Sequence, residues 1–202
     1  MSYTDTANQY IDDVLSGKVI SCKYVKEACQ RQKNDLATLT QYRFDTSKAE
    51  RICKFVELLP HIKGEWRGKP IRLNPWQIFI LTTVFGWVDE NNYRRFKTVY
   101  TEVPRKNGKS ALSSAVALYC LLADGEGGAE VFSAATTRDQ ARIVFADAAR
   151  MVEQSKGLQR QLGVRVMGKA LPHTILAESS GSVFKPLSRD QGGNLDGLNV
   201  HC

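Results

Sequence analysis

One stretch decides the fold, FKTVYTEVPRKNGKSALSSAVALYCLL at residues 96–122. Its first part, residues 96–103, is rich in β-branched and aromatic side chains, which predicts a strand. Its last part, residues 111–122, is an apolar run of good helix formers, which predicts a buried helix. A short loop at residues 104–110 joins the two. A strand, a loop and a helix in this order indicate an α/β protein with a parallel sheet and crossover helices.

The loop contains Gly108, Lys109 and Ser110, which are the residue types of a phosphate-binding loop. Amide groups at a helix N-terminus, together with the positive end of the helix dipole, bind phosphate oxygens. We expect Lys109 to reach the β- and γ-phosphates of a nucleotide and the Ser110 hydroxyl to ligate Mg²⁺, while Gly108 lets the backbone approach closely. The full G-x-x-x-x-G-K-[ST] pattern is not met, because Val103 occupies the position of the first glycine. A helix N-terminus with an exposed lysine is the alternative interpretation.

Other polar and aromatic residues favour a nucleotide over this alternative. Arg105, Lys106 and Lys109 place three cations within five residues of one loop. Such a cluster repels itself unless an anion binds there, and a triphosphate is such an anion. Upstream, Trp76 offers an aromatic face and Gln77 an amide that donates and accepts hydrogen bonds, which are the groups that an adenine ring needs. Core packing of Trp76 and a solvated Gln77 remain the alternatives for these two residues.

The rest of the chain is predicted from apolar spacing and capping signals. Helices are expected at residues 4–15, after Ser21, at residues 47–59, after Asn74, and after Thr136 or Thr137. Strands are expected at residues 130–135, 164–167, 174–177 and 182–187. The loop at residues 61–73 is the best candidate for a boundary. It divides the chain into a helical region at residues 1–68 and an α/β domain at residues 69–202.

Composition excludes several classes of protein. The chain has 202 residues, of which 43% are hydrophobic and 24% charged, as in folded globular proteins. Its net charge of +7 permits a polyanionic partner such as nucleic acid without requiring one. The five cysteines form no C-x-x-C pair and the three histidines are scattered, so the sequence predicts neither a zinc site nor a disulfide framework. The N-terminus has no features of a signal peptide, and no apolar run approaches the roughly 20 residues of a membrane span, so we expect a soluble intracellular protein.

Several stretches together resemble the large subunit of tailed-bacteriophage terminase. They are residues 13–17, 55–64, 73–77, 94–96, 102–110 and 129–141. The resemblance implies a P-loop (RecA-like) parallel sheet flanked by helices, with an N-terminal helical appendage. It also implies the ATPase half of a DNA-packaging motor, which uses ATP and Mg²⁺ to drive double-stranded DNA into a procapsid. The implied partners are the DNA, the terminase small subunit, the portal protein and further copies of the full-length chain in a ring, without a membrane. The implied location is the host bacterial cytoplasm and, transiently, the capsid portal vertex.

The same resemblance assigns roles to residues of the site. Arg105 corresponds to the Walker A arginine that senses or stabilises the γ-phosphate, and Arg105 and Lys109 are the expected catalytic residues. Ser110 is the expected Mg²⁺ ligand. The expected nucleotide-binding residues are Trp76, Gln77, Lys106, Asn107, Gly108, Lys109 and Ser110.

The segment at residues 133–141 also resembles a part of the family. It corresponds to the strand-to-helix element where related motors place nucleic-acid or coupling contacts. Arg138 and Arg142 lie one helical turn apart there. We expect their side chains either to face DNA phosphates or a neighbouring subunit's nucleotide, or to lie on a solvated helix face.

The chain also departs from the family pattern. In the family, a Walker B strand that ends in acidic residues follows a segment like residues 196–199, and the present sequence stops at Cys202, where that strand would begin. We therefore expect this polypeptide to be truncated, to bind nucleotide weakly, to hydrolyse it poorly or not at all, and to have no nuclease activity. Glu178, Asp190 and Asp196 have the context of ordinary loop residues rather than of Walker B carboxylates. A fragment of another helicase-like P-loop ATPase, or a non-enzymatic module that docks on DNA or a partner, are the alternative functions.

Overall fold

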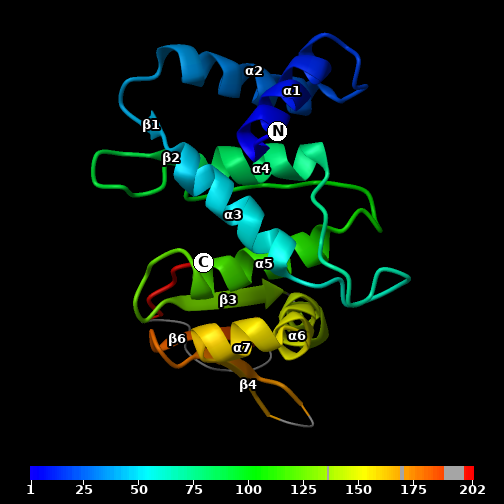
Figure 1. Cartoon of the computed structure of the whole chain (residues 1–202), viewed down its shortest axis with the longest axis vertical. Coiled ribbons are helices and arrows are strands. Elements are labelled where there is room, and N and C mark those ends of the chain that lie inside the picture. The colour runs from blue at the N-terminus through cyan, green and yellow to red at the C-terminus, as the bar shows by residue number, and fades with distance from the viewer. Residues whose placement is uncertain (136, 169–170, 189–197) are drawn as a thin grey trace. The chain divides into compact units, whose positions relative to one another are not determined.

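A computed structural model describes residues 1–135, 137–168, 171–188 and 198–202 (Figure 1). The chain packs into two compact units that alternate along the sequence. The first unit contains Met1–Lys54 and Arg72–Glu102, and the second contains Phe55–Ile71 and Val103–Cys202. The boundary of an ATPase domain between residues 68 and 69 stays a prediction.

The first unit is mainly helical. Its elements are α1 (Tyr3–Leu15), α2 (Lys23–Thr38), β1 (Arg43–Phe44), most of α3 (Thr46–Leu58), α4 (Pro75–Gly86) and β2 (Trp87–Val88). Helix α1 packs against α2 and α4, and Ile11, Val14, Cys29 and Phe79 form the buried cluster between them. The helices expected at residues 4–15, after Ser21, at residues 47–59 and after Asn74 are confirmed within one or two residues at their starts.

Arg95 organises the polar part of the first unit. Its guanidinium donates to the Asp35 carboxylate at 2.6 Å, and both side chains are largely buried. The same guanidinium lies over the ring of Phe96 at 4.9 Å and that of Trp87 at 5.5 Å. The indole of Trp87 in turn donates to the buried Gln32 amide oxygen at 2.8 Å. Because the cation is paired and its faces are covered by aromatic rings, this arrangement fixes the segment after β2 onto α2.

The second unit is a four-stranded sheet with helices packed against it. Its strands are β3 (Glu130–Ala135), β4 (Val164–Met167), β5 (Thr174–Ala177) and β6 (Ser182–Ser188). Its helices are α5 (Lys109–Leu122), α6 (Arg138–Gln154) and α7 (Lys156–Leu162). The strand order is β3-β6-β5-β4, and both α5 and α6 pack against β3 and β6 (Figure 1). The four strands lie at the predicted positions, and Thr137 caps α6 as predicted.

The sheet is mixed, which corrects the prediction of a parallel sheet. Strand β3 pairs with β6 in parallel, whereas β4–β5 and β5–β6 are antiparallel. The physical reason is the length of the connections, because the chain between β5 and β6 is a tight turn at residues 178–181. A parallel pair needs a crossover of a dozen or more residues, and a turn of this length joins antiparallel strands only.

The strand expected at residues 96–103 is absent, and this prediction was wrong. The segment has no strand assignment and no ladder partner among the described residues. Val99 and Tyr100 are exposed, with 48% and 85% of their surface accessible. β-Branched and aromatic residues favour strands because they pack on a pleated, half-buried surface, and this segment has no such surface to join.

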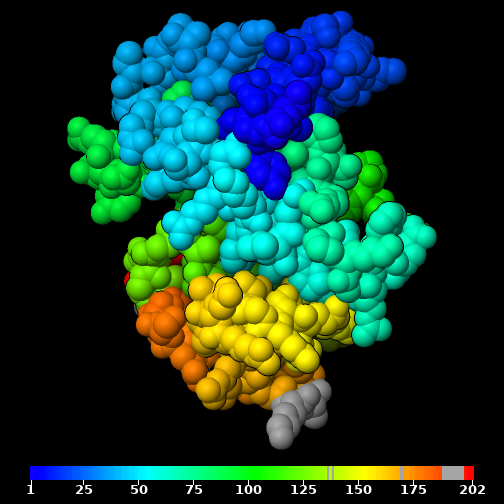
Figure 2. Space-filling view, viewed as in Figure 1, coloured from blue at the N-terminus to red at the C-terminus, as the bar shows by residue number. Residues whose placement is uncertain are grey.

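The core of the second unit lies between the sheet and helices α5 and α6. Phe145 of α6 and Phe184 of β6 are fully buried and meet edge to face, with ring centroids 5.2 Å apart. Leu118 of α5 and Ile175 of β5 are equally buried. Helix α7, by contrast, has no buried residue and lies at the surface as part of the yellow region in Figure 2. This lack of an apolar stripe explains why sequence spacing did not predict α7.

No helix in the described part of the chain combines the length and the apolar character that crossing a bilayer requires.

Candidate functional site

The loop before α5 is a turn that contains two residues with positive φ. Residues 105 and 106 form a turn and residues 107 and 108 a bend, and α5 begins at Lys109. Lys106 and Gly108 both adopt positive φ, 70° and 76°. Glycine adopts such a conformation without strain, whereas Lys106 costs roughly 1 kcal/mol or more there. Residues held in this region concentrate at ligand-binding and active sites.

The side chain of Asn107 stabilises this turn through hydrogen bonds to its backbone. Its side-chain amide donates to the carbonyl oxygens of Pro104 at 3.2 Å and Arg105 at 3.4 Å. Such local side-chain bonds hold a turn in one conformation. These hydrogen bonds stabilise the conformation of an exposed loop that no strand precedes.

The first turn of α5 presents amide groups to solvent. Gly108 is the N-cap of α5, and the first intrahelical bond runs from the Leu112 amide to the Gly108 carbonyl at 2.9 Å. The amides of Gly108, Lys109 and Ser110 have no acceptor among the described residues, as expected for the leading amides of a helix. These amides and the positive end of the helix dipole attract an anion.

The side chains around these amides are positive and accessible. Arg105, Lys106 and Lys109 are exposed, while Ser110 is half-buried at the start of the helix. The arrangement combines exposed cations with a half-buried hydroxyl in one short turn, which suits phosphate oxygens and a metal ion bound to them. The structure therefore brings together Arg105, Lys106, Asn107, Gly108, Lys109 and Ser110.

Helix α5 is anchored just behind the loop. The Ser114 hydroxyl is fully buried and lies 2.8 Å from the carbonyl oxygens of both Ser110 and Val144. Val144 belongs to α6, so this hydroxyl ties the first turns of α5 to α6. A loop that must bind a ligand in a fixed geometry benefits from such a rigid support.

Trp76 and Gln77 belong to the first unit, whereas the loop at residues 104–110 belongs to the second. Both lie in the first turn of α4, where Trp76 is half-buried and Gln77 is 8% exposed. The Gln77 side-chain oxygen accepts from the backbone amide of Asn74 at 2.9 Å. The interpretation of Gln77 as a solvated helix residue is therefore wrong, and its carbonyl oxygen serves the helix N-terminus.

Strand β3 and the N-cap of α6 both form hydrogen bonds to the first turns of α6. The Ser133 hydroxyl donates to the Ala141 carbonyl at 2.9 Å, and the Thr137 hydroxyl accepts from the Gln140 amide at 3.4 Å. Arg142 is half-buried, and its Nε atom is buried without a hydrogen-bond partner among the described residues. The interpretation that Arg142 lies on a fully solvated helix face is therefore wrong, because part of its guanidinium is buried.

The candidate acidic residues do not approach a Walker B arrangement in the described part of the chain. Glu178 lies at the turn after β5 and pairs with Arg165 of β4 at 3.0 Å, which is a surface ion pair. Asp190 and Asp196 lie outside the described residues. Glu178 therefore acts as a structural residue, as its sequence context indicated.

Sequence reasoning did not place the segment at residues 200–202. Val200 forms a parallel bridge with Glu130, and the Phe132 amide donates to the Cys202 carbonyl at 2.8 Å. This segment lies along the edge of β3 that β6 does not occupy. Its position is a long-range property that no local pattern encodes.

Comparisons with known proteins identify the family of this chain. A sequence profile of the terminase large subunit, ATPase domain, matches residues 75–201. The chain is 30% identical over 129 residues to the terminase large subunit of Enterobacteria phage HK97, over 62% of this chain and 24% of that protein. The crystal structure of the HK97 bacteriophage large terminase matches with a TM-score of 0.61 and 25% identity, over 76% of this chain and 29% of that one.

The present chain thus spans less than a third of the length of both relatives. The profile nevertheless matches more than half of the chain, and it includes the cationic loop, α5 and the whole sheet. The chain belongs to the terminase large-subunit family, and residues 75–201 correspond to the ATPase domain of that family.

Proposed function

We propose that this chain is the ATP-binding part of a phage DNA-packaging motor, in which ATP hydrolysis drives double-stranded DNA into a procapsid. One observation carries the proposal: the exposed turn at residues 105–110 presents cations and acceptor-free amides at the start of α5, within the part of the chain that matches the ATPase domain. The membership of the family supplies the class of reaction. The loop supplies the residues that would perform it.

The residues of the loop fit a triphosphate with Mg²⁺. The amides of Gly108, Lys109 and Ser110 donate to phosphate oxygens, and the absence of a side chain at Gly108 leaves room for them. Lys109 neutralises charge on the β- and γ-phosphates, and the Ser110 hydroxyl is a suitable ligand for the cation. Mg²⁺ supplies neutralisation of the charge that builds on the transferred phosphoryl group.

The remaining site residues have supporting roles in this proposal. Arg105 senses or stabilises the γ-phosphate, while Lys106 and Asn107 shape and charge the turn that holds it. Trp76 offers a face for adenine. Because the Gln77 oxygen already accepts from Asn74, the NH₂ group of Gln77 is the part that remains to donate to an adenine ring nitrogen.

The larger assembly belongs to the same proposal. We infer a RecA-like arrangement of the ATPase domain, a ring of full-length copies at the portal vertex, and contacts with the portal protein, the terminase small subunit and DNA. The host bacterial cytoplasm is the compartment where such an assembly works. The net charge of +7 supports a polyanionic partner.

We further propose that this 202-residue polypeptide binds ATP better than it hydrolyses it. No strand of the described residues ends in a pair of acidic side chains that could position a water molecule for attack. Loss of a general base commonly reduces the rate by about 10²- to 10⁴-fold while leaving the binding of phosphates to the loop intact. The same absence of clustered carboxylates argues against nuclease activity in the described part of this polypeptide.

The substitution Lys109→Ala tests the proposal. We expect it to weaken binding of a fluorescent ATP analogue in the presence of Mg²⁺ by at least about tenfold, because the phosphates lose a charge-assisted donor. The matched control is Lys156→Ala, which removes another exposed lysine of the second unit, at the start of α7. Equal affinities of the parent chain and Lys109→Ala would refute the proposal and favour a module that only docks on DNA or a protein.

A further inference from the structure

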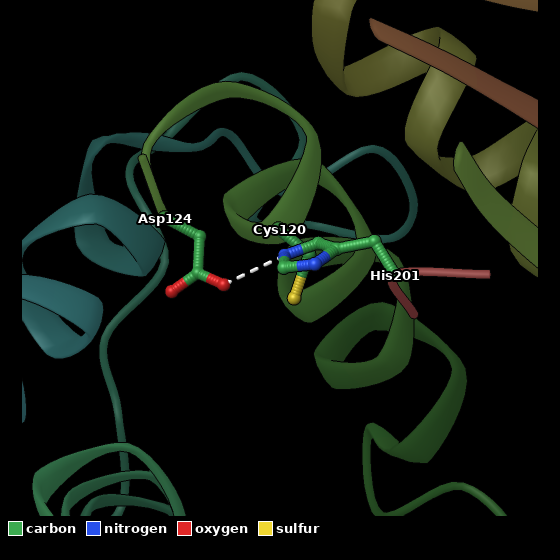
Figure 3. Close-up of side chains that lie close together, drawn as sticks. All are labelled: Cys120, Asp124 and His201. Carbon is green, nitrogen blue, oxygen red and sulfur yellow. Dashed lines mark hydrogen bonds and ion pairs between the residues drawn. The ribbon is translucent and has the colours of Figure 1, made fainter. Parts of the chain in front are cut away.

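Three potential metal ligands converge at the far end of α5. The side-chain donor atoms of Cys120, Asp124 and His201 all lie within 4.8 Å of one another (Figure 3). Cys120 is in the last turns of α5, Asp124 follows the end of that helix, and His201 lies in the segment beside β3. The sequence contains no metal-binding spacing, because 77 positions separate Asp124 from His201.

The surroundings hold these side chains in place. His201 Nε2 lies 2.8 Å from Asp124 Oδ2, and the backbone amide of His201 donates to the Glu130 carbonyl at 2.8 Å. Cys120 is 2% exposed, and the side chains of Asp124 and His201 are 14% and 19% exposed. The cluster is therefore largely enclosed, although Asp124 and His201 are each partly exposed.

We propose that Cys120, Asp124 and His201 form a binding site for Zn²⁺ or a similar transition-metal cation. A thiolate, an imidazole and a carboxylate are the ligands that Zn²⁺ takes in proteins, whereas Mg²⁺ prefers oxygen ligands alone. Zinc bonds of about 2.0–2.3 Å in a tetrahedron separate the ligand atoms by about 3.3–3.8 Å. Donor atoms that lie up to 4.8 Å apart must therefore approach by about 1 Å, while His201 Nε2 and Asp124 Oδ2, which lie 2.8 Å apart, must separate by about 0.5 Å.

We expect a water molecule to take the fourth position when a metal ion binds. Cys202 is exposed and does not belong to the cluster of donor atoms. Three protein ligands and a water molecule make a weaker site than the four-ligand structural zinc sites. Binding releases the thiol proton of Cys120 to solvent, because the thiolate is the ligand.

The site and the nucleotide loop occupy opposite ends of one helix. Helix α5 has 14 residues, which is a length of about 21 Å, and its negative dipole end favours a cation just as its positive end favours phosphate. A bound metal ion ties the end of α5 to the segment beside β3. Nucleotide binding and metal binding can therefore be tested independently.

The test is metal binding by the purified 202-residue chain. We expect about one equivalent of Zn²⁺ to remain after desalting, and Co²⁺ to give a thiolate charge-transfer band. His201→Asn should lower the Zn²⁺ affinity by at least about tenfold, and Cys120→Ser should abolish the Co²⁺ band. His201→Asn changes a side chain near the surface, and circular dichroism checks that each variant is folded.

Matched controls separate this site from adventitious binding. Cys29→Ser changes another buried cysteine, and His173→Asn another histidine, so both should leave the stoichiometry and the Co²⁺ band unchanged. Lys109→Ala should also retain the metal. Uptake well below one equivalent, or equal uptake by His201→Asn and the parent chain, would overturn the proposal and leave Asp124 and His201 as an ordinary hydrogen-bonded pair.

Discussion

Basic residues in the stretches that resemble the terminase large subunit differ in burial. Some stabilise the fold, and others are exposed where a ligand could bind. Arg95 is largely buried, paired with Asp35 and covered by aromatic rings, so it stabilises the first unit. Lys109 and Arg105 are exposed at the start of α5, and neither forms an ion pair with an acidic side chain of the described residues. Sequence alone treats these as similar cations, and burial distinguishes them.

The thiol of Cys29 should be much less reactive than that of Cys22. Cys29 is fully buried against α1 and α4, and desolvation raises its pKa from 9.0 to about 11. Cys22 is exposed at the N-cap of α2. In mildly alkaline solution we expect iodoacetamide to label Cys22 in the folded chain and Cys29 only after unfolding, as measured by mass spectrometry.

The same pKa predicts a loss of stability at high pH. The unfolded chain releases the Cys29 proton near pH 9.0, before the folded chain does. Its contribution to the free energy of unfolding is therefore present below pH 9.0 and is lost as the pH rises toward about 11. Cys29→Ala should flatten this part of the stability profile. Native-state labelling of Cys29 as fast as Cys22 would contradict both expectations.

At the scale of elements, local signals predicted positions well and pairing poorly. Helix starts at α1, α4 and α6 and the spans of β3, β4 and β5 follow from caps and from apolar spacing. Residues 96–103 have strong β-propensity and nevertheless form no strand, because a strand needs a neighbour to pair with. The Gln77 side-chain oxygen likewise accepts a hydrogen bond from the Asn74 amide, which the prediction of an adenine contact did not include.

Close packing at the end of α4 makes Gly86 intolerant of a side chain. A Cβ atom there would lie 2.5 Å from a ring carbon of Phe44, whose ring packs edge to face on Trp87 with centroids 5.4 Å apart. We expect Gly86→Ala to lower the free energy of unfolding by about 1–3 kcal/mol, because the ring must shift. Urea denaturation followed by tryptophan fluorescence measures the change.

Gly157 provides the control for this substitution. It lies in α7 with nothing within 4 Å of the position of an added Cβ. Gly157→Ala should therefore stabilise the protein by up to about 1 kcal/mol through helix propensity. A Gly86→Ala variant as stable as the parent chain would mean that the contact between β1 and α4 is looser than described.

At the scale of the whole molecule, the net charge of +7 is the property most relevant to the proposed DNA partner. Duplex binding should weaken steeply as salt increases, because each phosphate contact releases condensed counterions. Arg138 begins α6, in the element where we propose a nucleic-acid contact. We expect Arg138→Gln to reduce the slope of log affinity against log salt by about 1, as measured by fluorescence anisotropy of a labelled duplex.

Arg160→Gln is the matched control, since Arg160 is an exposed arginine in the last turn of α7. It removes the same charge from the same unit and should leave the slope unchanged. Equal slopes for both variants and the parent chain would exclude Arg138 as a phosphate contact. An affinity that does not vary with salt would count against DNA as a partner of this chain.

The sequence by itself determined every described helix except α7, the positions of β3 to β6, the chemistry of the loop at residues 105–110 and the resemblance to terminase large subunits. These follow from patterns that a few neighbouring residues complete, such as a cap, an apolar repeat or a cluster of cations. Tertiary structure alone decided that the sheet is mixed, that residues 96–103 stay unpaired with any strand of the described chain, and that His201 meets Asp124 and Cys120. Strand pairing and ligand clusters join residues far apart in the chain, so their free energy depends on which surfaces meet when the chain folds, and no local pattern contains that information.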